Sequence, residues 1–310
     1  MVSINILNYN TFEKSCICID SCLNQQGVNY QILLIDNAST DDSYARLQAR
    51  YGNNIEYYQT GTNYGYAGGN NKGVEYCYSR GFEYAFLLNS DTEIKGAALL
   101  SELQNIAVSN SNCAVVSPTI FDVTKAGLIK HTNDYFYNKM LRKIKVLPPI
   151  KDITDKVELV SEAHGAAMLV DCKKFLEVGG FPEHYFMYCE ESTFAKKILW
   201  AGYDILWHKD DNSCIYHHHD KTVSVAPWRE YLMGRNRVIE YFENRNKHSH
   251  LWYFIFKLFQ LKMYIEVIKT KNMHYYYGME NGRSLIKQKA SKSECYSKGV
   301  EIQKKLIDQL

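Results

Sequence analysis

The sequence contains no uninterrupted hydrophobic run of the length that crosses a membrane. Its most apolar stretch, LWYFIFKLFQLKMYIEVI (251–268), is broken by two lysines, a glutamine and a glutamate, whereas a spanning helix needs about 20 consecutive apolar residues. A helix that combines aromatic residues with lysine favours the membrane surface instead. The chain also opens directly on strand-like residues, VSINILNYN, so we expect no signal peptide.

The nine cysteines do not form the pattern of a disulfide framework or of a zinc site. Their number is odd and they are scattered along the chain, with no CxxC pair to indicate a metal. Cys18 and Cys22 are four residues apart, as on one face of a helix. We interpret the cysteines as small buried hydrophobic residues and expect a reducing compartment, the cytoplasm.

The formal net charge is only +2, but the charge is unevenly distributed. Residues 1–228 hold 20 Lys and Arg against 26 Asp and Glu, whereas residues 229–310 hold 16 against 8. An acidic body with a basic tail indicates that the tail meets something anionic. A solvated helical face is the alternative interpretation. No feature of the sequence leads us to expect a nucleic acid partner.

Two common nucleotide-binding fingerprints are missing. No GxGxxG follows the first expected strand, and the glycine-rich stretch NYGYAGGNNKG (63–73) lacks the Lys-Ser/Thr pair of a P-loop. This disfavours an NAD-dependent Rossmann enzyme. A nucleotidyltransferase is disfavoured too, because its glycine- and arginine-rich loop is absent. We expect 63–73 to be a loop in which the backbone approaches a nucleotide closely; a flexible loop that caps a helix is the alternative.

The first hundred residues alternate between strand and helix periodicity. Strands are expected at 3–9, 30–36, 55–59 and 83–89. The helices between them are expected to begin at an Asn10/Glu13 capping box, at Asp41–Asp42 and at Asn70–Asn71. This pattern predicts an α/β fold with a parallel sheet and right-handed crossovers.

The second half of the chain is less regular. Strands are expected at 113–117, 165–171, 204–208 and 213–217, and a helix at 191–201, with an irregular excursion over 122–158. After Pro227 the pattern is helical. We therefore predict one α/β domain at 1–226 and a basic, aromatic-rich helical region at 227–310.

Polar residues follow three of the expected strands at the edge where ligands bind in parallel sheets. Each group alone could be turn chemistry, but three at one edge of a sheet favour a binding site. They are Asn8 and Asn10 after the first strand, Asp36, Asn37 and Ser39 after the second, and Asn89, Ser90 and Asp91 after the fourth.

The segment FLLNSDTE (86–93) carries the strongest chemical signal. Asn89 and Asp91 supply hard oxygen ligands two residues apart at the end of an apolar strand. Such ligands suit Mg²⁺ or Mn²⁺, with substrate phosphates completing the coordination.

Two further groups are candidates for chemistry. Glu190 and Glu191 begin a helix after an aromatic run; they could simply complement the helix dipole, or one could be a carboxylate whose pKa is raised toward that of a useful base. His217 belongs to a histidine triplet (217–219) and is either a metal or phosphate ligand or part of a surface cluster.

Taken together, these segments resemble family 2 glycosyltransferases of the GT-A fold, in the rhamnosyltransferase-like branch. The resemblance implies a Rossmann-like α/β fold with a mixed, mainly parallel sheet and a C-terminal helical appendage. The similar pieces, in the order of the family, are INILNYN, LLIDNASTDDS, TNYGYAGGNNKG, FLLNSDTEI, GGFPEHYFMYCEES, AGY, IYH and GRNRVIEYF. They span about residues 2–242; we find no similar motif in 243–310.

The resemblance implies an inverting enzyme that uses a nucleoside-diphosphate sugar and a divalent cation, Mg²⁺ or Mn²⁺. By position, Asp36 would recognise the base, and Gly68, Gly69, Asn70 and Asn71 would line the donor pocket. Asn89, Ser90 and Asp91 correspond to the metal motif, and His217 to a histidine that completes the site. Glu191 falls on the catalytic base.

The sequence departs from the family pattern at several of these positions. Asn89 replaces an acid, Pro182 replaces the usual Asp, and Glu191 replaces Asp in the acidic pair, so either Glu190 or Glu191 could be the base. A catalytically silent scaffold that binds a nucleotide sugar is therefore the alternative hypothesis.

The resemblance also guides our expectations about substrates and location. We expect rhamnose from dTDP-rhamnose as donor and a saccharide or lipid-linked saccharide as acceptor, in bacterial surface polysaccharide synthesis. The tail would place the protein at the inner face of the plasma membrane, or in a homodimer interface.

Overall fold

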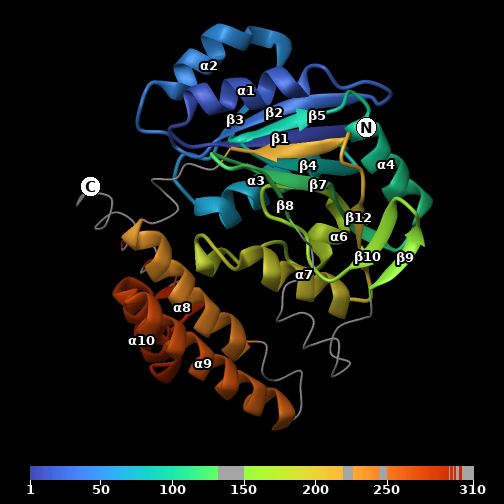
Figure 1. The fold of residues 1–310 in the computed structure, drawn as a ribbon. Coiled ribbons are helices and arrows are strands. Elements are labelled where there is room, and N and C mark those ends of the chain that lie inside the picture. The colour runs from blue at the N-terminus through green and yellow to red at the C-terminus, as the bar shows by residue number, and fades with distance from the viewer. Residues whose placement is uncertain are drawn as a thin grey trace. The chain divides into compact units, whose positions relative to one another are not determined.

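The computed structural model describes residues 1–131, 150–218, 226–243 and 250–292, together with 294, 295, 297, 300 and 301 (Figure 1). Its contacts divide the chain into two compact units. The first comprises Met1–Phe181 and Phe194–His219, and the second Pro182–Thr193 and Asp220–Leu310. The division at residue 226 that we predict from the sequence stays a prediction, and each unit is described by itself.

A nine-stranded sheet forms the centre of the first unit, in the order β3-β2-β1-β4-β11-β6-β12-β10-β9. The first four strands in this order run parallel. β11 is antiparallel to both of its neighbours, β6 pairs parallel with β12, and β9 and β10 are antiparallel. The predicted α/β fold with a mixed sheet is confirmed. The bounds are β1 Val2–Asn8, β2 Tyr30–Asp36, β3 Glu56–Gln59, β4 Tyr84–Asn89, β6 Cys113–Ser117, β9 Lys151–Thr154, β10 Val157–Val160, β11 Ala167–Asp171 and β12 Asp204–His208.

Helices cover both faces of this sheet, as Figure 1 shows. Ile4 and Ile6 of β1 pack in one core cluster with α1, α2 and α4, whereas Ala85 and Leu87 of β4 pack in a second with α3, α6 and α7. Strands buried on both faces explain the nearly continuous apolar runs in the sequence. The bounds are α1 Phe12–Cys22, α2 Ser43–Tyr51, α3 Gly65–Ser79, α4 Leu99–Ser109, α6 Cys172–Glu177 and α7 Glu190–Trp200, with short 3₁₀ turns η1 Gly52–Asn54 and η2 Glu183–Tyr185.

All nine cysteines are free and buried. Cys18 and Cys22 lie on α1 with no exposed side-chain area. Burial also raises the pKa of Cys22 well above its ordinary value, so its thiol stays protonated. This confirms the interpretation of the cysteines as small hydrophobic residues.

A second, four-stranded sheet has the order β5-β13-β7-β8. β13 pairs antiparallel with β5 and parallel with β7, so that His217 lies opposite both Thr92 and Asp122. The irregular excursion expected over 122–158 is in part wrong, because β8, β9 and β10 lie within it; residues 132–149 lie outside the described residues. The bounds are β5 Thr92–Lys95, β7 Thr119–Thr124, β8 Gly127–Lys130 and β13 Cys214–His217.

The glycine-rich stretch is helical, not the expected loop. α3 begins at Gly65 rather than at Asn70, and its glycines lie against the sheet. A Cβ at Gly69 would come within 2.6 Å of Leu7 Cδ1, and one at Gly73 within 2.2 Å of Ile35 Cδ1. The glycines therefore serve close packing of α3 on β1 and β2.

The second unit contains the helices α8 (Pro227–Glu243), α9 (His250–Thr270) and α10 (Met273–Lys287), as predicted from the helical pattern after Pro227. α8 and α10 pack with their backbones close together, because a Cβ at Gly278 would lie 2.0 Å from the carbonyl oxygen of Tyr231. Among the described residues, no helix has the length and apolar character needed to span a membrane.

Candidate active site

The ends of β1 and β2 carry one hydrogen-bonded polar cluster. Asn8 lies opposite Asp36 in the parallel register, and its Nδ2 donates to Asp36 Oδ1 at 2.9 Å and to Ser39 Oγ at 3.0 Å. The Ser39 hydroxyl donates to Asp36 Oδ1 at 2.6 Å. The structure thus brings together the polar residues predicted at the first two strand ends.

The cluster extends to the end of β4 through a residue that the sequence did not single out. The hydroxyl oxygen of Thr11 lies 2.9 Å from both Asn8 Oδ1 and Ser90 Oγ. Asn89, the last residue of β4, lies opposite Leu7 in the register. The carboxyl ends of three neighbouring strands therefore share one polar edge, where open α/β sheets bind ligands.

Two predicted site residues use their side chains to hold loops. The side chain of Asn10, whose φ is 55°, donates to the hydroxyl of Thr40 and accepts from its backbone N–H. α1 begins at Phe12 after Thr11, without the predicted capping box. Asn37 donates from Nδ2 to the carbonyl of Gly65 at 3.0 Å and accepts from the N–H of Tyr64 at 3.1 Å. Asn10 and Asn37 thus fix the loops that border the polar edge of the sheet.

On α3, Gly68, Gly69, Asn70 and Asn71 are buried. Asn71 exchanges two 2.9 Å hydrogen bonds with the backbone of Phe181, which ties α3 to the turn after α6. Asn70 differs, because Nδ2 donates to the carbonyl of Tyr66 but Oδ1 is buried without a partner among the described residues. A buried acceptor without a donor is unfavourable, which makes Asn70 the stronger ligand candidate.

Asp91 and His217 lie together although 126 positions separate them. Asp91 is in the turn between β4 and β5, and the β5–β13 pairing brings the His217 Nε2 to 3.4 Å from Asp91 Oδ1. The other ring nitrogen, Nδ1, lies 3.1 Å from Oδ1 of Asp122 on β7. A buried imidazole thus sits between two carboxylates.

This arrangement changes the protonation of His217. Burial alone lowers the pKa of the imidazole, but the hydrogen bonds to Asp122 and Asp91 and the charges of both carboxylates raise the pKa to about 9. At neutral pH the two carboxylates therefore hold the ring as an imidazolium, and a cation bound at Asp91 would have to replace the proton on Nε2 before His217 could coordinate it.

Three of the residues at this point were missed by the sequence analysis. Besides Asp122, they are His131, whose Nε2 forms an ion pair with Asp122, and His164, whose ring lies 4.3 Å from that of His131 and 5.7 Å from that of His217 between centroids. His164 also accepts from the N–H of Ala166 at Nδ1. The β7–β13 pairing brings Asp122 to His217 and the β7–β8 pairing brings His131 to Asp122, whereas His164 lies in the segment between β10 and β11. No local motif signals these contacts.

The residues around Asp91 fit a divalent cation whose coordination is completed from outside the protein. One carboxylate and one imidazole are ordinary ligands of Mn²⁺, and Mg²⁺ and Mn²⁺ commonly take their other ligands from phosphates and water. Within the described ranges, no three His, Cys, Asp or Glu side chains are grouped so as to hold a metal by themselves.

Glu190 and Glu191 begin α7 and belong to the second unit. Glu190 is buried, its Oε2 lacks a partner among the described residues, and burial, followed by the charge of Glu191, raises its pKa well above the ordinary value. The Glu191 side chain is half-buried. The pair thus consists of a fully buried carboxyl with a raised pKa and a half-buried one, of which the Oε2 atom is also buried.

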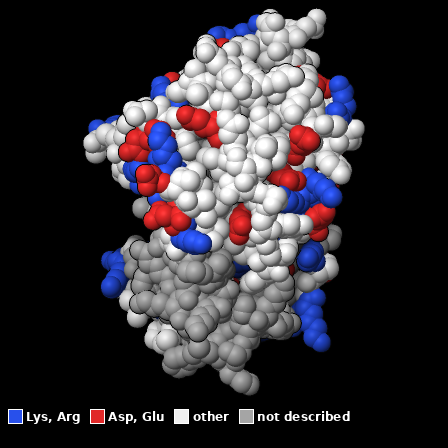
Figure 2. All heavy atoms as spheres, turned by 90° about the vertical axis from the view of Figure 1, so that its right-hand side faces the viewer, with Lys and Arg blue, Asp and Glu red and all other residues white. Residues whose placement is uncertain are grey.

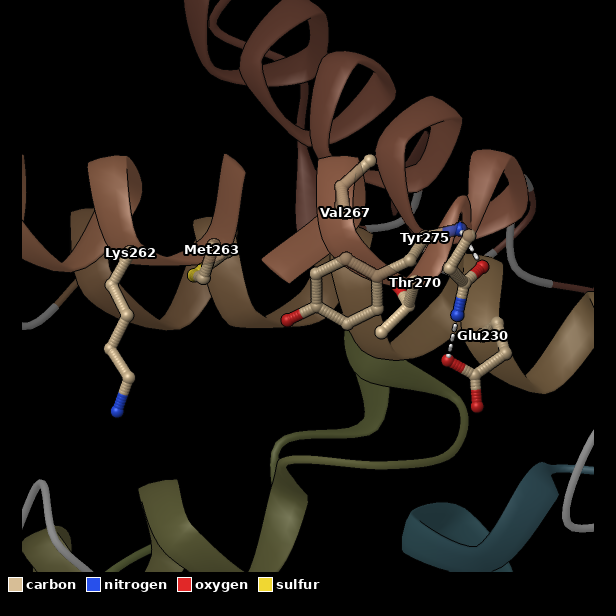
Figure 3. A pocket seen from close by; sticks show the side chains of 7 residues that line it. Glu230, Lys262, Met263, Val267, Thr270 and Tyr275 are labelled. Carbon is tan, nitrogen blue, oxygen red and sulfur yellow. Dashed lines mark hydrogen bonds between the residues drawn. The ribbon is translucent and has the colours of Figure 1, made fainter. Parts of the chain in front are cut away.

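The second unit also contains a cavity of about 590 Å³ between α8, α9 and α10. Figure 3 shows Lys262 and Met263 toward one end and, toward the other, Glu230, which accepts a 2.7 Å hydrogen bond from Asn272. No residue that lines it is a predicted site residue. The cavity is therefore separate from the chemistry considered above.

The face shown in Figure 2 carries acidic and basic side chains in alternation. On β10 and β12 and the turns beside them they form ion pairs, such as Lys156 with Asp210 at 2.6 Å and Lys209 with Glu158 at 3.3 Å. Among the described residues, this face shows no patch of one sign that would attract a polyanion.

Solved structures with the same fold hold nucleotides or nucleotide sugars, as their names state. The chain resembles the mannosyltransferase PcManGT from Pyrobaculum calidifontis, in complex with GDP-Man and Mn²⁺ (TM-score 0.57, 16% identity, 80% of this chain and 65% of that one). It also resembles GalNAc-T7 with UDP, GalNAc and Mn²⁺ (0.56, 13%, 71% and 44%) and S. aureus TarS in complex with UDP (0.52, 16%, 77% and 65%). The chain thus spans less than two thirds of these three proteins, and the predicted GT-A fold is confirmed.

Sequence comparison identifies the family. The sequence model described as Glycosyl transferase family 2 matches residues 3–168, and the chain belongs to that family. Similar proteins are the low-salt glycan biosynthesis hexosyltransferase Agl10 of Haloferax volcanii (27% identity, 77% of this chain and 74% of that protein) and the rhamnosyltransferase WbbL of Escherichia coli K12 (25%, 72% and 88%). The predicted family and its rhamnosyltransferase-like character are confirmed.

Proposed function

We propose that this protein transfers a sugar from a nucleoside-diphosphate donor to an acceptor hydroxyl, with inversion at the anomeric carbon. The observation that carries the proposal is the pairing of Asp91 with His217 in the unit that also holds the Asn8–Asp36–Ser39 cluster. A base-binding carboxylate and a phosphate-proximal cation site are the two parts that such a donor requires.

Each part has a distinct role. The Asp36 carboxylate, held by Asn8 and Ser39, accepts hydrogen bonds from the base or ribose of the nucleotide sugar. The side-chain oxygen of Asn70 accepts a further hydrogen bond from the nucleotide sugar. Asp91 and His217 would hold Mg²⁺ or Mn²⁺, with Asn89, two residues before Asp91, as the further oxygen ligand that the family resemblance implies. When bound, this cation neutralises the charge that develops on the departing diphosphate.

The acidic pair supplies the base. Glu191 removes the proton from the acceptor hydroxyl as its oxygen attacks, because Glu191 is the less buried member of the pair and falls on the base position that the family resemblance implies. Glu190, buried and with a raised pKa, stays protonated beside it, so the two acids do not repel each other as two charges would. The sugar passes through an oxocarbenium-like state, as in glycosyl transfer generally.

The donor we propose is dTDP-rhamnose, and the acceptor a saccharide or lipid-linked saccharide in bacterial surface polysaccharide synthesis. The likeness to the rhamnosyltransferase WbbL supports the sugar. UDP, GDP-mannose and N-acetylgalactosamine appear in the names of the structural neighbours and are the competing donor chemistries.

We further propose that the protein acts in the cytoplasm, on the inner face of the plasma membrane. The support comes from α9, where Leu258, Leu261, Ile265 and Ile268 are exposed at helical spacing. Interfacial helices have such an apolar stripe, usually flanked by lysine. A homodimer formed through the same stripe is the alternative.

Thermal unfolding with a panel of nucleotide sugars tests the donor site, since a ligand that binds the folded state raises its apparent stability. We expect dTDP-rhamnose with Mn²⁺ to raise the midpoint of the wild type and to have little effect on Asp91→Asn. A metal-dependent shift that persists in Asp91→Asn would contradict the metal assignment.

Acceptor-dependent release of nucleoside diphosphate separates the enzyme from a silent scaffold. We expect Glu191→Gln to bind the donor as the wild type does and to lose transfer by about 100-fold or more, the usual contribution of a general base. Full transfer by Glu191→Gln would reject that residue as the base. Donor binding by the wild type without any turnover would favour the scaffold.

A further inference from the structure

The turn just before the acidic pair has an unusual backbone. Phe186, Tyr188 and Cys189 have φ angles of 67°, 71° and 71°, values that residues with a Cβ rarely adopt. Three such residues within four positions form a strained turn, which persists only where the surrounding structure fixes it. Both Phe186 and Cys189 are buried. The groups that fix the turn therefore determine where α7 and its first carboxylates begin.

A single buried amide on α8 holds this turn. Asn236 Nδ2 lies within hydrogen-bond distance of three carbonyl oxygens of this turn, those of Tyr185 (3.1 Å), Met187 (2.7 Å) and Tyr188 (2.9 Å). The Asn236 side chain has no exposed area. Carbonyl groups that would otherwise repel one another thus converge on one donor.

The neighbouring residue sets the direction of the amide. Arg235 Nε donates to Asn236 Oδ1 at 2.8 Å, and Nη2 donates to the carbonyl of Tyr185 at 2.9 Å. Because the Oδ1 of Asn236 faces a guanidinium that can only donate, its Nδ2 must face the turn. Arg235 is itself fully buried, and its Nη1 donates to the carbonyl of Cys295.

The same helix also contacts the residues on both sides of the turn. Glu240 accepts a 2.7 Å hydrogen bond from Ser192 in the first turn of α7 and is paired with Arg237 at 3.0 Å. The hydroxyl of Tyr185 donates to Glu243 Oε2 at 2.9 Å. Residues 236, 240 and 243 are spaced by four and three, so they lie on one face of α8.

We propose that Asn236, oriented by Arg235, is a positioning residue that fixes the Phe186–Cys189 turn and thereby sets the direction of the Glu190–Glu191 carboxyl pair. This inference rests on the proposed function, because it assumes that one of these two acids removes the proton of the acceptor hydroxyl. The helical second unit then contributes to catalysis through this contact, in addition to any part in membrane binding.

Two substitutions test this proposal. Asn236→Ala removes the donor, and Asn236→Asp keeps the shape but points a carboxylate at the carbonyl oxygens. We expect both to lower kcat by about 100-fold, the effect of misplacing a reacting group by roughly 1 Å, with the affinity for the nucleotide donor unchanged. Arg235→Lys, which keeps a charge but loses the forked geometry, should give a smaller loss of kcat.

Asn272→Ala is the matched control. Asn272 is a hydrogen-bonded asparagine of the same unit, which accepts from the N–H of Tyr275 at the start of α10 and donates to Glu230. We expect it to lower thermal stability while kcat of the folded protein stays at the wild-type value. Wild-type kcat in Asn236→Ala, or an equal loss in Asn272→Ala, would overturn the proposal.

Hydrogen exchange gives a readout that needs no activity. The amides of residues 186–191 should exchange faster in Asn236→Ala than in the wild type or in Asn272→Ala. If the wild type transfers no sugar, the proposed function fails, but faster exchange confined to Asn236→Ala would still support the positioning of the turn. Unchanged exchange in that variant would count against it.

Discussion

At the residue scale, the burial of Glu190 makes the free energy of unfolding depend on pH. The carboxyl ionises near pH 4.5 in the unfolded chain, whereas burial, and then the Glu191 charge, raises its pKa in the folded protein. Between these two pKa values the folded state binds the proton that the unfolded state has released. Glu190 therefore makes the free energy of unfolding fall as pH rises through that window.

Glu190→Gln removes this dependence, because an amide does not titrate. We expect the melting temperature of the variant, relative to the wild type, to be higher at pH 8 than at pH 5, with a slope of at most about 3 °C per pH unit. Scanning calorimetry at several pH values measures it. The control is Glu83→Gln, whose side chain is 75% exposed and which should follow the wild type; a relative melting temperature that is the same at both pH values would refute the assignment.

At the element scale, the packing of α10 on α8 depends on contacts between backbones. A Cβ at Gly278 would lie 2.0 Å from the carbonyl oxygen of Tyr231, and one at Gly234 would lie 2.3 Å from that of Tyr275. Backbone atoms of a helix cannot rotate away as side-chain atoms can. An alanine here must separate the two helices, which would also shift α8 against the turn that it holds.

Gly278→Ala should therefore destabilise the protein by about 1–3 kcal/mol or more, the usual cost of overpacking, despite the better helix propensity of alanine. Gly73→Ala is the matched comparison, because its Cβ would approach side-chain atoms and no backbone atom, the nearest being Ile35 Cδ1 at 2.2 Å, the flexible end of a side chain. We expect a clearly smaller loss there. Equal unfolding midpoints for the two variants in a denaturant titration would argue against the backbone explanation.

The elements also show which parts of the site a sequence can reveal. Asn8, Asp36 and Asn89 were predictable because apolar strand patterns end on them, and parallel strands meet at a common edge. Asp122 and His164 were not, because Asp122 meets His217 through the pairing of β7 with β13 and His164 meets it through a ring contact, each between segments far apart in the chain. The helical start of α3 was also missed, since glycine normally signals a loop and here serves close packing.

At the scale of the whole molecule, the uneven charge and the surface of α9 point to the same partner. The exposed apolar residues of α9 follow one another at intervals of three and four positions, and Lys257, Lys262 and Lys269 are exposed beside them. Apolar side chains enter the headgroup region of a bilayer while lysines attract anionic lipids. The excess of basic residues in 229–310 adds to that attraction.

Vesicle co-sedimentation tests this idea. We expect the protein to bind vesicles that contain phosphatidylglycerol but not pure phosphatidylcholine, and to be released as salt rises toward 1 M, where the Debye length falls to about 3 Å. The double variant Leu261→Glu/Ile268→Glu should lose at least about tenfold in affinity, whereas Val108→Glu, at a 63% exposed apolar residue of α4, should bind normally. If the stripe instead joins two copies of the chain, the wild type would be a dimer in solution, the double variant would be a monomer, and neither would bind vesicles. That result would remove the membrane from the proposed function and leave the proposed transfer reaction unaffected.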